Sequence, residues 1–333
     1  MRAQDARGPR TVDGESGAPL DAGPTVADVS PGRYDGSGSA SPQWWPSRYG
    51  PDDRIGSGNE LTPDRVLQAL RLPTRGIVLE LAQGTTAGVP APAPRLYNQV
   101  ILAHETLEAV SGSAGVNEFS TFQEQVTTSN HVGCHVDGLG HVGIAGRYYN
   151  GLHYSEIYRP GGLRDLGIDR ARPWISRGVC LDVAGLVGVP ALEEGVVVTA
   201  EHLQEASARQ GVVVRAGDAV LVNTGWGALW GTDLDRYSAG EPGLGWDGAH
   251  WLTDRRPSIV GADNWGFDVV PFEHPDRWYV VHQHVITETG THILENITTA
   301  ALVAGQHWEF LFVLAPAKLA GATAAVVCPV AVV

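Results

Sequence analysis

The chain has 333 residues, of which 43% are hydrophobic and 18% are charged, a composition typical of a globular protein. Its 23 basic and 37 acidic residues give a formal net charge of -14, which disfavours nucleic acids and anionic membranes as partners. The three cysteines, Cys134, Cys180 and Cys328, do not suggest a disulfide framework, so we expect a reducing, cytoplasmic location.

Residues 1–42 are rich in Gly, Ser, Pro, Asp and Arg and show no hydrophobic periodicity. This composition predicts a flexible or arm-like N-terminal segment, either free or lying on another subunit. No apolar stretch follows the first arginines, so we expect no signal peptide. Residues 43–333 are expected to form the folded domain.

Helix signals are strongest at two places. The run Thr62-Pro63-Asp64 predicts a helix start, because a capping hydroxyl precedes a proline at the first helical position and an acid in the first turn. Thr199 predicts the start of a second helix, which runs to about Gln210 and ends at Gly211.

Strands are predicted at residues 76–81 and 178–183, and as two β runs around a turn within 212–222. The Gly- and Trp-rich stretch 226–251 is predicted to be an irregular loop. The apolar run 310–333 is broken by two prolines and a lysine, which favours buried strands with turns over a membrane helix.

Residues 130–151, NHVGCHVDGLGHVGIAGRYYNG, place His131, His135, Asp137 and His141 within eleven positions. Imidazole and carboxylate groups together suit a divalent ion such as Zn, Mn or Fe. The alternative is that these are ordinary surface or core side chains, because an HxxxH pair alone often occurs without a metal. Four such groups in one Gly-rich stretch favour the metal site.

The spacing restricts the backbone. On a flat strand His131 and His135 would stand about 13 Å apart, at roughly 3.3 Å per residue, too far to share an ion. On a helical turn, residues four apart are separated by roughly 6 Å. We therefore predict a turn or short helical coil, with Gly133 freeing the backbone. Asp137 could reach the same ion or bridge two, and His141 could be another ligand or a proton shuttle.

The segment HVGCHVDGLGH resembles the HxGTHxDxxxH signature of the cyclase-like metal hydrolases, the family of bacterial kynurenine formamidase and isatin hydrolase. Five further segments resemble this family in the same order along the chain: Tyr49–Pro63, Gly217–Trp226, Val260–Pro271, Val281–Ile297 and the C-terminal FVLAPAKLAGATAAVVCPVAV. The resemblance covers about residues 44–333. Its most specific part is the first motif together with the ENI segment that ends at Ile297.

The resemblance implies a mixed α/β fold with a β-rich core and flanking helices, the swivelling β/β/α fold of this family. It implies one or two divalent ions, Zn or Mn, bound by His131, His135, Asp137, His282 and Glu295. His141 would be the catalytic proton-transfer residue. His284 is the alternative to His282, because the spacing between this histidine and the glutamate varies among relatives.

Two features near the site stay open. Cys134 replaces the usual Thr of the signature and is either a small filler or a thiolate ligand or nucleophile. Trp226, Trp265 and Tyr97 are candidate substrate-binding residues, although tryptophans in such loops also pack structurally. The helix-like run 282–289, closed by Gly290, is expected to bring His282 and Glu295 together.

The predicted function is a metal-dependent hydrolase that uses a metal-activated water to open or cleave a small amide, such as a cyclic amide or an arylformamide. Alternatives are a lactone or ester hydrolase with the same site, a metal-assisted lyase or cyclase in secondary metabolism, and a non-catalytic metal-binding protein. The expected partner is a small-molecule substrate. Because relatives are commonly homo-oligomers, we also expect a dimer or tetramer.

Overall fold

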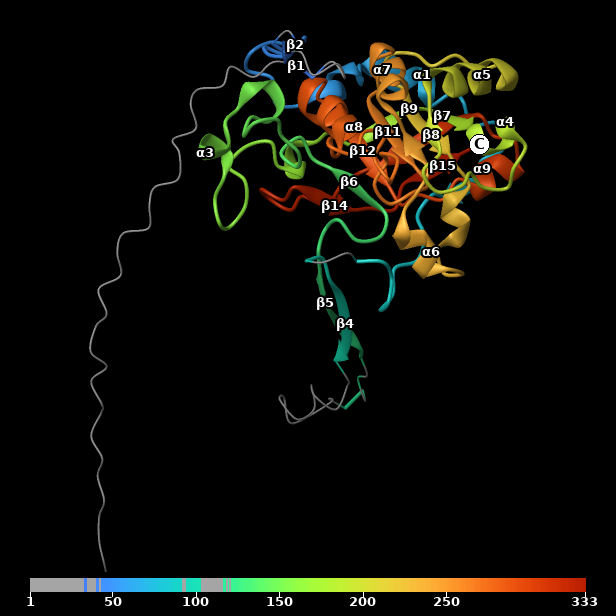
Figure 1. Ribbon diagram of the computed structural model, residues 1–333. Coiled ribbons are helices and arrows are strands. Elements are labelled where there is room, and N and C mark those ends of the chain that lie inside the picture. Colours follow the sequence, from blue (N-terminus) through green and yellow to red (C-terminus); the bar gives the residue numbers. More distant parts are fainter. Residues whose placement is uncertain are drawn as a thin grey trace, which may run out of the picture. The chain divides into compact units, whose positions relative to one another are not determined.

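A mixed sheet of nine strands forms the core of the described part of the chain, in the order β14-β6-β12-β11-β9-β7-β13-β15-β3 (Figure 1). Its centre is parallel: β7 pairs with β9, β9 with β11, and β11 with β12. These strands span Trp174–Asp182 (β7), Ala219–Asn223 (β9), Ile259–Ala262 (β11) and His292–Glu295 (β12). All side chains of β9 are buried, as expected for a parallel strand covered on both faces.

The strands on either side of this centre are antiparallel to their neighbours. They span Val78–Glu80 (β3), His135–Asp137 (β6), Glu309–Leu314 (β13), Ala324–Val326 (β14) and Val330–Val332 (β15). Three of them come from the C-terminal apolar run, which confirms the prediction of strands with turns there.

The computed structural model describes residues 33–34, 40–41, 43–91, 94–102, 116–117, 119 and 121–333. The chain divides into two units, Met1–Ser30 and Pro31–Val333, and all described residues belong to the second. Nearly all of the predicted arm, residues 1–42, lies outside the described residues. The arm and its boundary at residue 43 therefore stay predictions.

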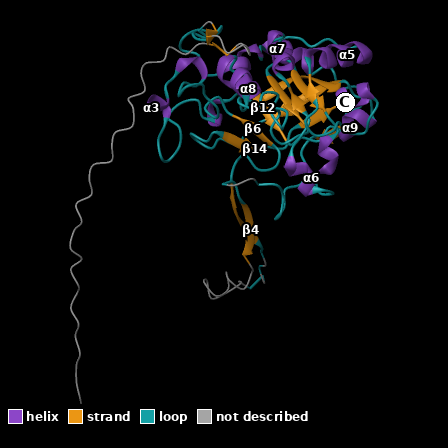
Figure 2. Ribbon diagram, in the orientation of Figure 1, coloured by secondary structure: helices purple, strands orange, loops and turns teal. Residues whose placement is uncertain are grey.

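Helices cover both faces of the sheet (Figure 2). They are α1 (Pro63–Ala69), α3 (Tyr154–Ile157), α4 (Val183–Val187), α5 (Ala200–Gln210), α6 (Leu234–Ala239), α7 (Trp246–Asp254), α8 (Val280–His282) and α9 (Ala300–Ala304). A π-helical turn, η5 (Gln283–Glu288), continues α8. Among the described residues, no helix has both the length and the apolar character needed to cross a bilayer.

Short elements complete the described structure. Three two-stranded sheets pair β1 (Arg33–Tyr34) with β2 (Ala40–Ser41), β8 (Val197–Val198) with β10 (Gly243–Leu244), and β4 (Tyr97–Leu102) with β5 (Gln123–Thr128). The 3-10 turns are η1 (Gly56–Glu60), η2 (Tyr149–Gly151), η3 (Ile168–Arg170) and η4 (Trp226–Leu229).

Alternation along the central strands creates two apolar layers. Val220 and Val222 of β9 belong to one buried cluster, while Leu221 between them belongs to the other. Successive side chains of a strand point to opposite faces, so one strand supplies both layers. Leu203 of α5 and Leu252 of α7 cover the first face. The predicted mixed α/β fold with a β-rich core and flanking helices is confirmed.

The capping predictions are also confirmed. The Thr62 hydroxyl accepts from the Arg65 N–H at 3.4 Å at the start of α1. The Thr199 hydroxyl accepts from the His202 N–H at 3.3 Å, and α5 ends at Gly211, which has a left-handed φ of 68°.

Two local predictions were wrong. Only the second β run of 212–222 forms a strand. Val212 and Val214 of the first run are buried, but residues 212–215 pair with no neighbouring strand among the described residues. The stretch 226–251 is not an irregular loop: it contains η4, α6, β10 and the start of α7. The many glycines and tryptophans suggested a loop, but α7 is an amphipathic helix whose Ala249 and Leu252 pack into the core.

Candidate metal centre

The segment from His131 to Asp137 changes conformation half-way. Residues 131–134 form a turn in which Gly133 has a φ of 70°, as predicted. A Cβ at Gly133 would lie 2.4 Å from Thr85 Oγ1, so the turn also needs the missing side chain. From His135 onward the chain is strand β6 rather than coil, because β12 and β14 pair with it on either side. On a strand, His135 and Asp137 share a face.

The second segment reaches the centre from the other end of the chain. The helical run from Val280 to Glu288 is followed by a reversal at Gly290, which has a φ of 69° and leads into β12. His282 Nε2 consequently lies 3.0 Å from Glu295 Oε1. The predicted helix and reversal are confirmed. Strand register then places Glu295 opposite His135.

Four imidazoles surround the Asp137 carboxylate. Asp137 Oδ1 lies 3.0 Å from His131 Nδ1 and 3.6 Å from His135 Nε2. Asp137 Oδ2 lies 3.6 Å from His282 Nε2 and 3.8 Å from His141 Nε2. All four candidate histidines are therefore grouped around a carboxylate that is only 1% exposed.

Glu295 closes the cluster on one side. Its Oε2 lies 3.1 Å from His135 Nε2 while its Oε1 faces His282. Two groups of possible ligands, each with its donor atoms within 4.8 Å of one another, are His131-Asp137-His141 and His135-Asp137-Glu295. Asp137 is common to both groups, so it would be a ligand in either case, whether one ion or two were bound.

Unpaired donor atoms show that the cluster fits a cation. Among the described residues, His131 Nδ1, His135 Nε2 and both Asp137 oxygens are buried without a hydrogen-bond partner. Buried polar groups are nearly always hydrogen-bonded, so such orphans indicate a missing ligand. Nitrogen and oxygen donors in this mixture suit a divalent ion such as Zn or Mn.

The ring nitrogens that face away from the cluster are held by neighbours. His135 Nδ1 lies 2.8 Å from the Gly133 carbonyl, and His131 Nε2 lies 3.1 Å from Thr323 Oγ1. His282 Nδ1 lies 2.6 Å from Asp268 Oδ2. Metal-binding histidines usually have such a partner, which fixes the ring orientation.

Sequence reasoning did not identify Thr323 or Asp268 as part of the site. The signal for Asp268 was present, since it is an acid in Val260–Pro271, one of the segments that resemble the family. Thr323 lies in the equally similar C-terminal segment, where nothing marked it as a partner of a histidine.

The cluster has strongly shifted pKa values. Burial alone would raise the pKa of Asp137, but His141, His131 and His282 around it hold that pKa well below its usual value. Burial would lower the pKa of His282, yet Asp268, Asp137 and Glu295 raise it overall. Burial lowers the pKa of His141 to about 4, so its imidazole is neutral at neutral pH.

A cavity of about 320 Å³, called here the His141 cavity, opens beside the cluster. It is lined by Arg95, His141, Val142, Trp265, Gly266, Trp278, Tyr279, His282, Gln283 and Glu295. A substrate in this cavity would therefore contact His141, whose side chain is 23% exposed, and the edge of the cluster.

The candidate substrate residues fall in three different places. Trp265 lines the His141 cavity. Trp226 does not line this cavity. It is fully buried, and its Nε1 donates to the Tyr237 carbonyl at 3.3 Å, so its role is in the packing of the protein interior. Tyr97 does not line the cavity either, because it lies on β4 and donates its hydroxyl to Gln99 Oε1 at 2.7 Å.

The adjacent pair Trp278 and Tyr279, and Arg95, are cavity residues that sequence reasoning missed. Trp278 and Tyr279 directly precede the helical run that carries His282, which was the available signal. Arg95 follows a proline-broken loop, and its Nη1 donates to the His131 carbonyl at 3.2 Å. Only the tertiary structure connects it with the site.

His284 and Cys134 lie outside the cluster. The His284 ring nitrogens lie 2.8 Å from Thr253 Oγ1 and 2.8 Å from Glu288 Oε2, so His282 is the histidine that faces Glu295. Cys134 packs in a hydrophobic cluster, and burial raises the pKa of its thiol. A neutral, buried thiol favours the filler role over that of ligand or nucleophile.

Comparison with known proteins agrees with this architecture. Residues 55–269, well over half of the chain, match the model of the Cyclase family. Among curated proteins, none matches the chain. A solved structure described as a novel cyclase is 26% identical, with a TM-score of 0.77 over 86% of this chain and 98% of that one.

Two isatin hydrolases are more distant relatives in structure. Isatin hydrolase A from Ralstonia solanacearum is 19% identical, with a TM-score of 0.59 over 77% of this chain and 91% of that one. The enzyme from Labrenzia aggregata is 17% identical, with a TM-score of 0.57 over 77% of this chain and 93% of that one. At these identities the likeness concerns the fold. From the family match and the shared fold, the chain belongs to the Cyclase family.

Proposed function

We propose that the protein is a metal-dependent hydrolase that cleaves the C–N bond of a small amide, such as a cyclic amide or an arylformamide. The observation that carries this proposal is the buried Asp137 carboxylate, whose two oxygens lack hydrogen bonds although imidazoles surround it. One or two Zn or Mn ions would be held by His131, His135, Asp137, His282 and Glu295.

When bound, such an ion lowers the pKa of a water from 15.7 to about 7 and polarises a carbonyl group. His141 would move the proton. Its imidazole is neutral at neutral pH and borders the His141 cavity, so it can accept a proton from water and return it to the leaving nitrogen. Asp137, at 3.8 Å, stabilises the imidazolium formed in between.

The walls of the His141 cavity indicate the substrate's shape. Trp265, Trp278 and Tyr279 offer aromatic surfaces for a flat apolar part, and Arg95 offers a cation for a polar substituent. We therefore propose aryl or fused-ring amides in preference to alkyl amides. The same centre would also open a lactone, which is the second candidate, because a polarised ester carbonyl reacts in the same way.

Product analysis tests this function. The Zn- and Mn-loaded proteins would be incubated with matched aryl and alkyl amides, cyclic amides and lactones, and the products measured by mass spectrometry. A cyclic amide or lactone should give one product that has gained one water, and an acyclic amide should give an acid and an amine whose masses add up to substrate plus water. A product with no added water would favour the lyase or cyclase alternative, and no turnover of any compound by either form would contradict a hydrolase.

The β4–β5 hairpin supports the expected homo-oligomer. Among the described residues, its strands pair only with each other. Ile101 and Val126 lie on one face of the hairpin and expose 56% and 46% of their surface, and Val100 on the other face exposes 48%. An isolated two-stranded hairpin is marginally stable, and exposed apolar side chains favour burial against another chain. Glu124 is the one charged residue on its strands, so a second copy of this acidic chain could pack there without strong repulsion. We propose a dimer or tetramer that uses this surface; the cytoplasmic location stays a prediction.

Ile101→Lys is expected to convert the oligomer to a smaller species, because it replaces the most exposed apolar side chain of the β4–β5 strands with a charged one. Size-exclusion chromatography with light scattering would measure the mass. Val187→Lys, at a residue of α4 that is 51% exposed, is the matched control and should keep the wild-type mass. A monomeric wild type would contradict the proposed assembly.

A further inference from the structure

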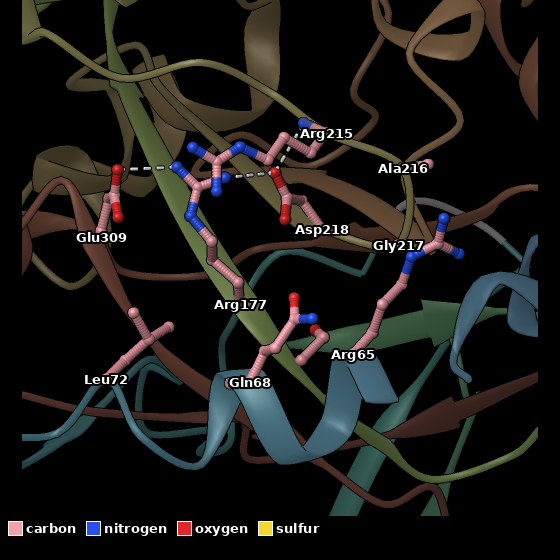
Figure 3. Close-up of a pocket in the computed structure, with 11 residues that line it drawn as sticks. Arg65, Gln68, Leu72, Arg177, Arg215, Ala216, Gly217, Asp218 and Glu309 are labelled. Carbon is pink, nitrogen blue, oxygen red and sulfur yellow. Dashed lines mark hydrogen bonds and ion pairs between the residues drawn. The ribbon is translucent and has the colours of Figure 1, made fainter. Parts of the chain in front are cut away.

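A second cavity, of about 330 Å³ and called here the arginine cavity, lies between α1, β7, β13 and the turn that precedes β9 (Figure 3). Arg65, Arg177 and Arg215 line it, together with Asp218 and Glu309. No residue that lines it also lines the His141 cavity. The proposed hydrolysis therefore gives these arginines no role.

Arg177 is fixed at the wall of the cavity. Its Nη1 donates to Asp218 Oδ2 at 2.6 Å, and its Nη2 donates to Glu309 Oε1 at 2.7 Å (Figure 3). Its side chain is 10% exposed. Charge-assisted pairs of this kind hold a guanidinium in one orientation, so Arg177 and both acids form a rigid wall.

Arg65 is also held in place, by hydrogen bonds to Glu60, and it lies against the glycine at position 217. Its Nη1 donates to Glu60 Oε2 at 2.6 Å and to the Glu60 carbonyl at 2.7 Å. Gly217 has a φ of +89°, and a Cβ there would lie 2.8 Å from Arg65 Cδ. The turn and the arginine side chain can therefore approach each other only because residue 217 lacks a side chain.

Arg215 differs from the other two arginines. Among the described residues, its guanidinium has no hydrogen bond or ion pair; only its backbone N–H donates, to Asp218 Oδ2 at 2.7 Å. Figure 3 shows its guanidinium beside that of Arg177. Arg177 contacts both lining acids and Arg65 pairs with Glu60, so Arg215 is the lining arginine whose guanidinium no acid contacts among the described residues. An anion near Arg215 would supply this missing partner.

Ser176 supplies a second, independent observation. It lines the arginine cavity, is 1% exposed, and its Oγ has no hydrogen-bond partner among the described residues. Buried hydroxyls are normally hydrogen-bonded, so an unpaired one indicates a missing partner. A hydroxyl can donate to an oxyanion, as guanidinium groups do.

We propose that the arginine cavity binds a small oxyanion, either a carboxylate or a phosphate, with Arg215 as the main cation and Arg65 and Ser176 as further donors. The planar guanidinium is the group best matched to such oxygens. The ligand would bind away from the metal centre, and the site would not depend on the proposed hydrolytic activity.

Isothermal titration of the full-length, metal-loaded protein tests this site. Inorganic phosphate and succinate are the two probes, at constant ionic strength set with chloride. Saturable binding of at least one is expected, and the probe that binds identifies the class. Arg215→Gln should weaken it by about 10- to 100-fold, since it removes charge-assisted hydrogen bonds.

Two further variants test a second donor of the site and provide a control. Ser176→Ala should weaken the same probe by a smaller factor, of roughly 2- to 10-fold. Arg71 is an exposed arginine just beyond α1 that does not line the cavity. The Arg71→Gln variant should bind the probe with the wild-type affinity. Binding of neither probe by the wild type, or equal binding by the wild type and a folded Arg215→Gln variant, would overturn the proposal.

Discussion

Replacing His141 with alanine is expected to lower kcat by about 10²- to 10⁴-fold, the usual contribution of a positioned general acid or base. The metal content should stay at the wild-type level, because His131, His135, Asp137, His282 and Glu295 remain. The physical reason is that His141 borders the cavity as a neutral imidazole, with Asp137 Oδ2 at 3.8 Å to stabilise its protonated form. Steady-state kinetics and elemental analysis on the same preparations would measure both effects.

The two readouts separate the alternatives for this residue. Full activity in His141→Ala would remove it from the proton-transfer role. Loss of metal together with activity would instead make it a ligand, which is possible because His141 belongs to one of the two groups of donor atoms. His274→Ala is a matched control, since His274 is an exposed histidine that does not line the cavity.

Asp137→Asn is expected to abolish near-stoichiometric metal binding and, with it, hydrolysis. Mutation of a residue that only hydrogen-bonds to a metal ligand typically lowers metal affinity by about 10- to 100-fold. Asp137 belongs to both groups of possible ligands, so its loss should lower the affinity further. Asparagine keeps the shape of the side chain but removes the negative charge that the surrounding imidazoles face. Elemental analysis of protein purified without added metal measures the effect, and circular dichroism checks the fold.

The control for this substitution is Asp235→Asn, at an exposed residue in the first turn of α6, which should retain wild-type metal and activity. Metal retained at the wild-type level in Asp137→Asn would contradict the proposed centre. Failure of wild-type protein to bind Zn or Mn, even after reconstitution, would contradict the metal-dependent mechanism as a whole.

Local chemistry made a large part of the site predictable. Caps such as Thr62 and Thr199 act within one helical turn, so they can be identified without knowledge of the fold. The same holds for the turn at Gly133, because an ion shared by His131 and His135 excludes an extended backbone between them. The resemblance to a known family added the distant pair His282 and Glu295, which composition and spacing alone do not connect.

Tertiary pairing decided what local chemistry could not. His135 begins a strand because β12 and β14 flank it, and the register of β12 against β6 is what places Glu295 opposite His135. Trp226 and Trp265 look alike in sequence, yet one is fully buried and the other lines the His141 cavity.

The sequence by itself therefore determined the chemical character of the proposed site, a His- and Asp-rich motif of the residue types that bind divalent ions, and its resemblance to a known family implied the mixed α/β fold. The tertiary structure alone decided which distant side chains meet that motif, including Asp268, Thr323 and Arg95. The physical reason is that helix caps and tight turns depend mainly on their immediate neighbours in sequence. Contacts between residues far apart depend instead on strand register and on the packing of the whole core.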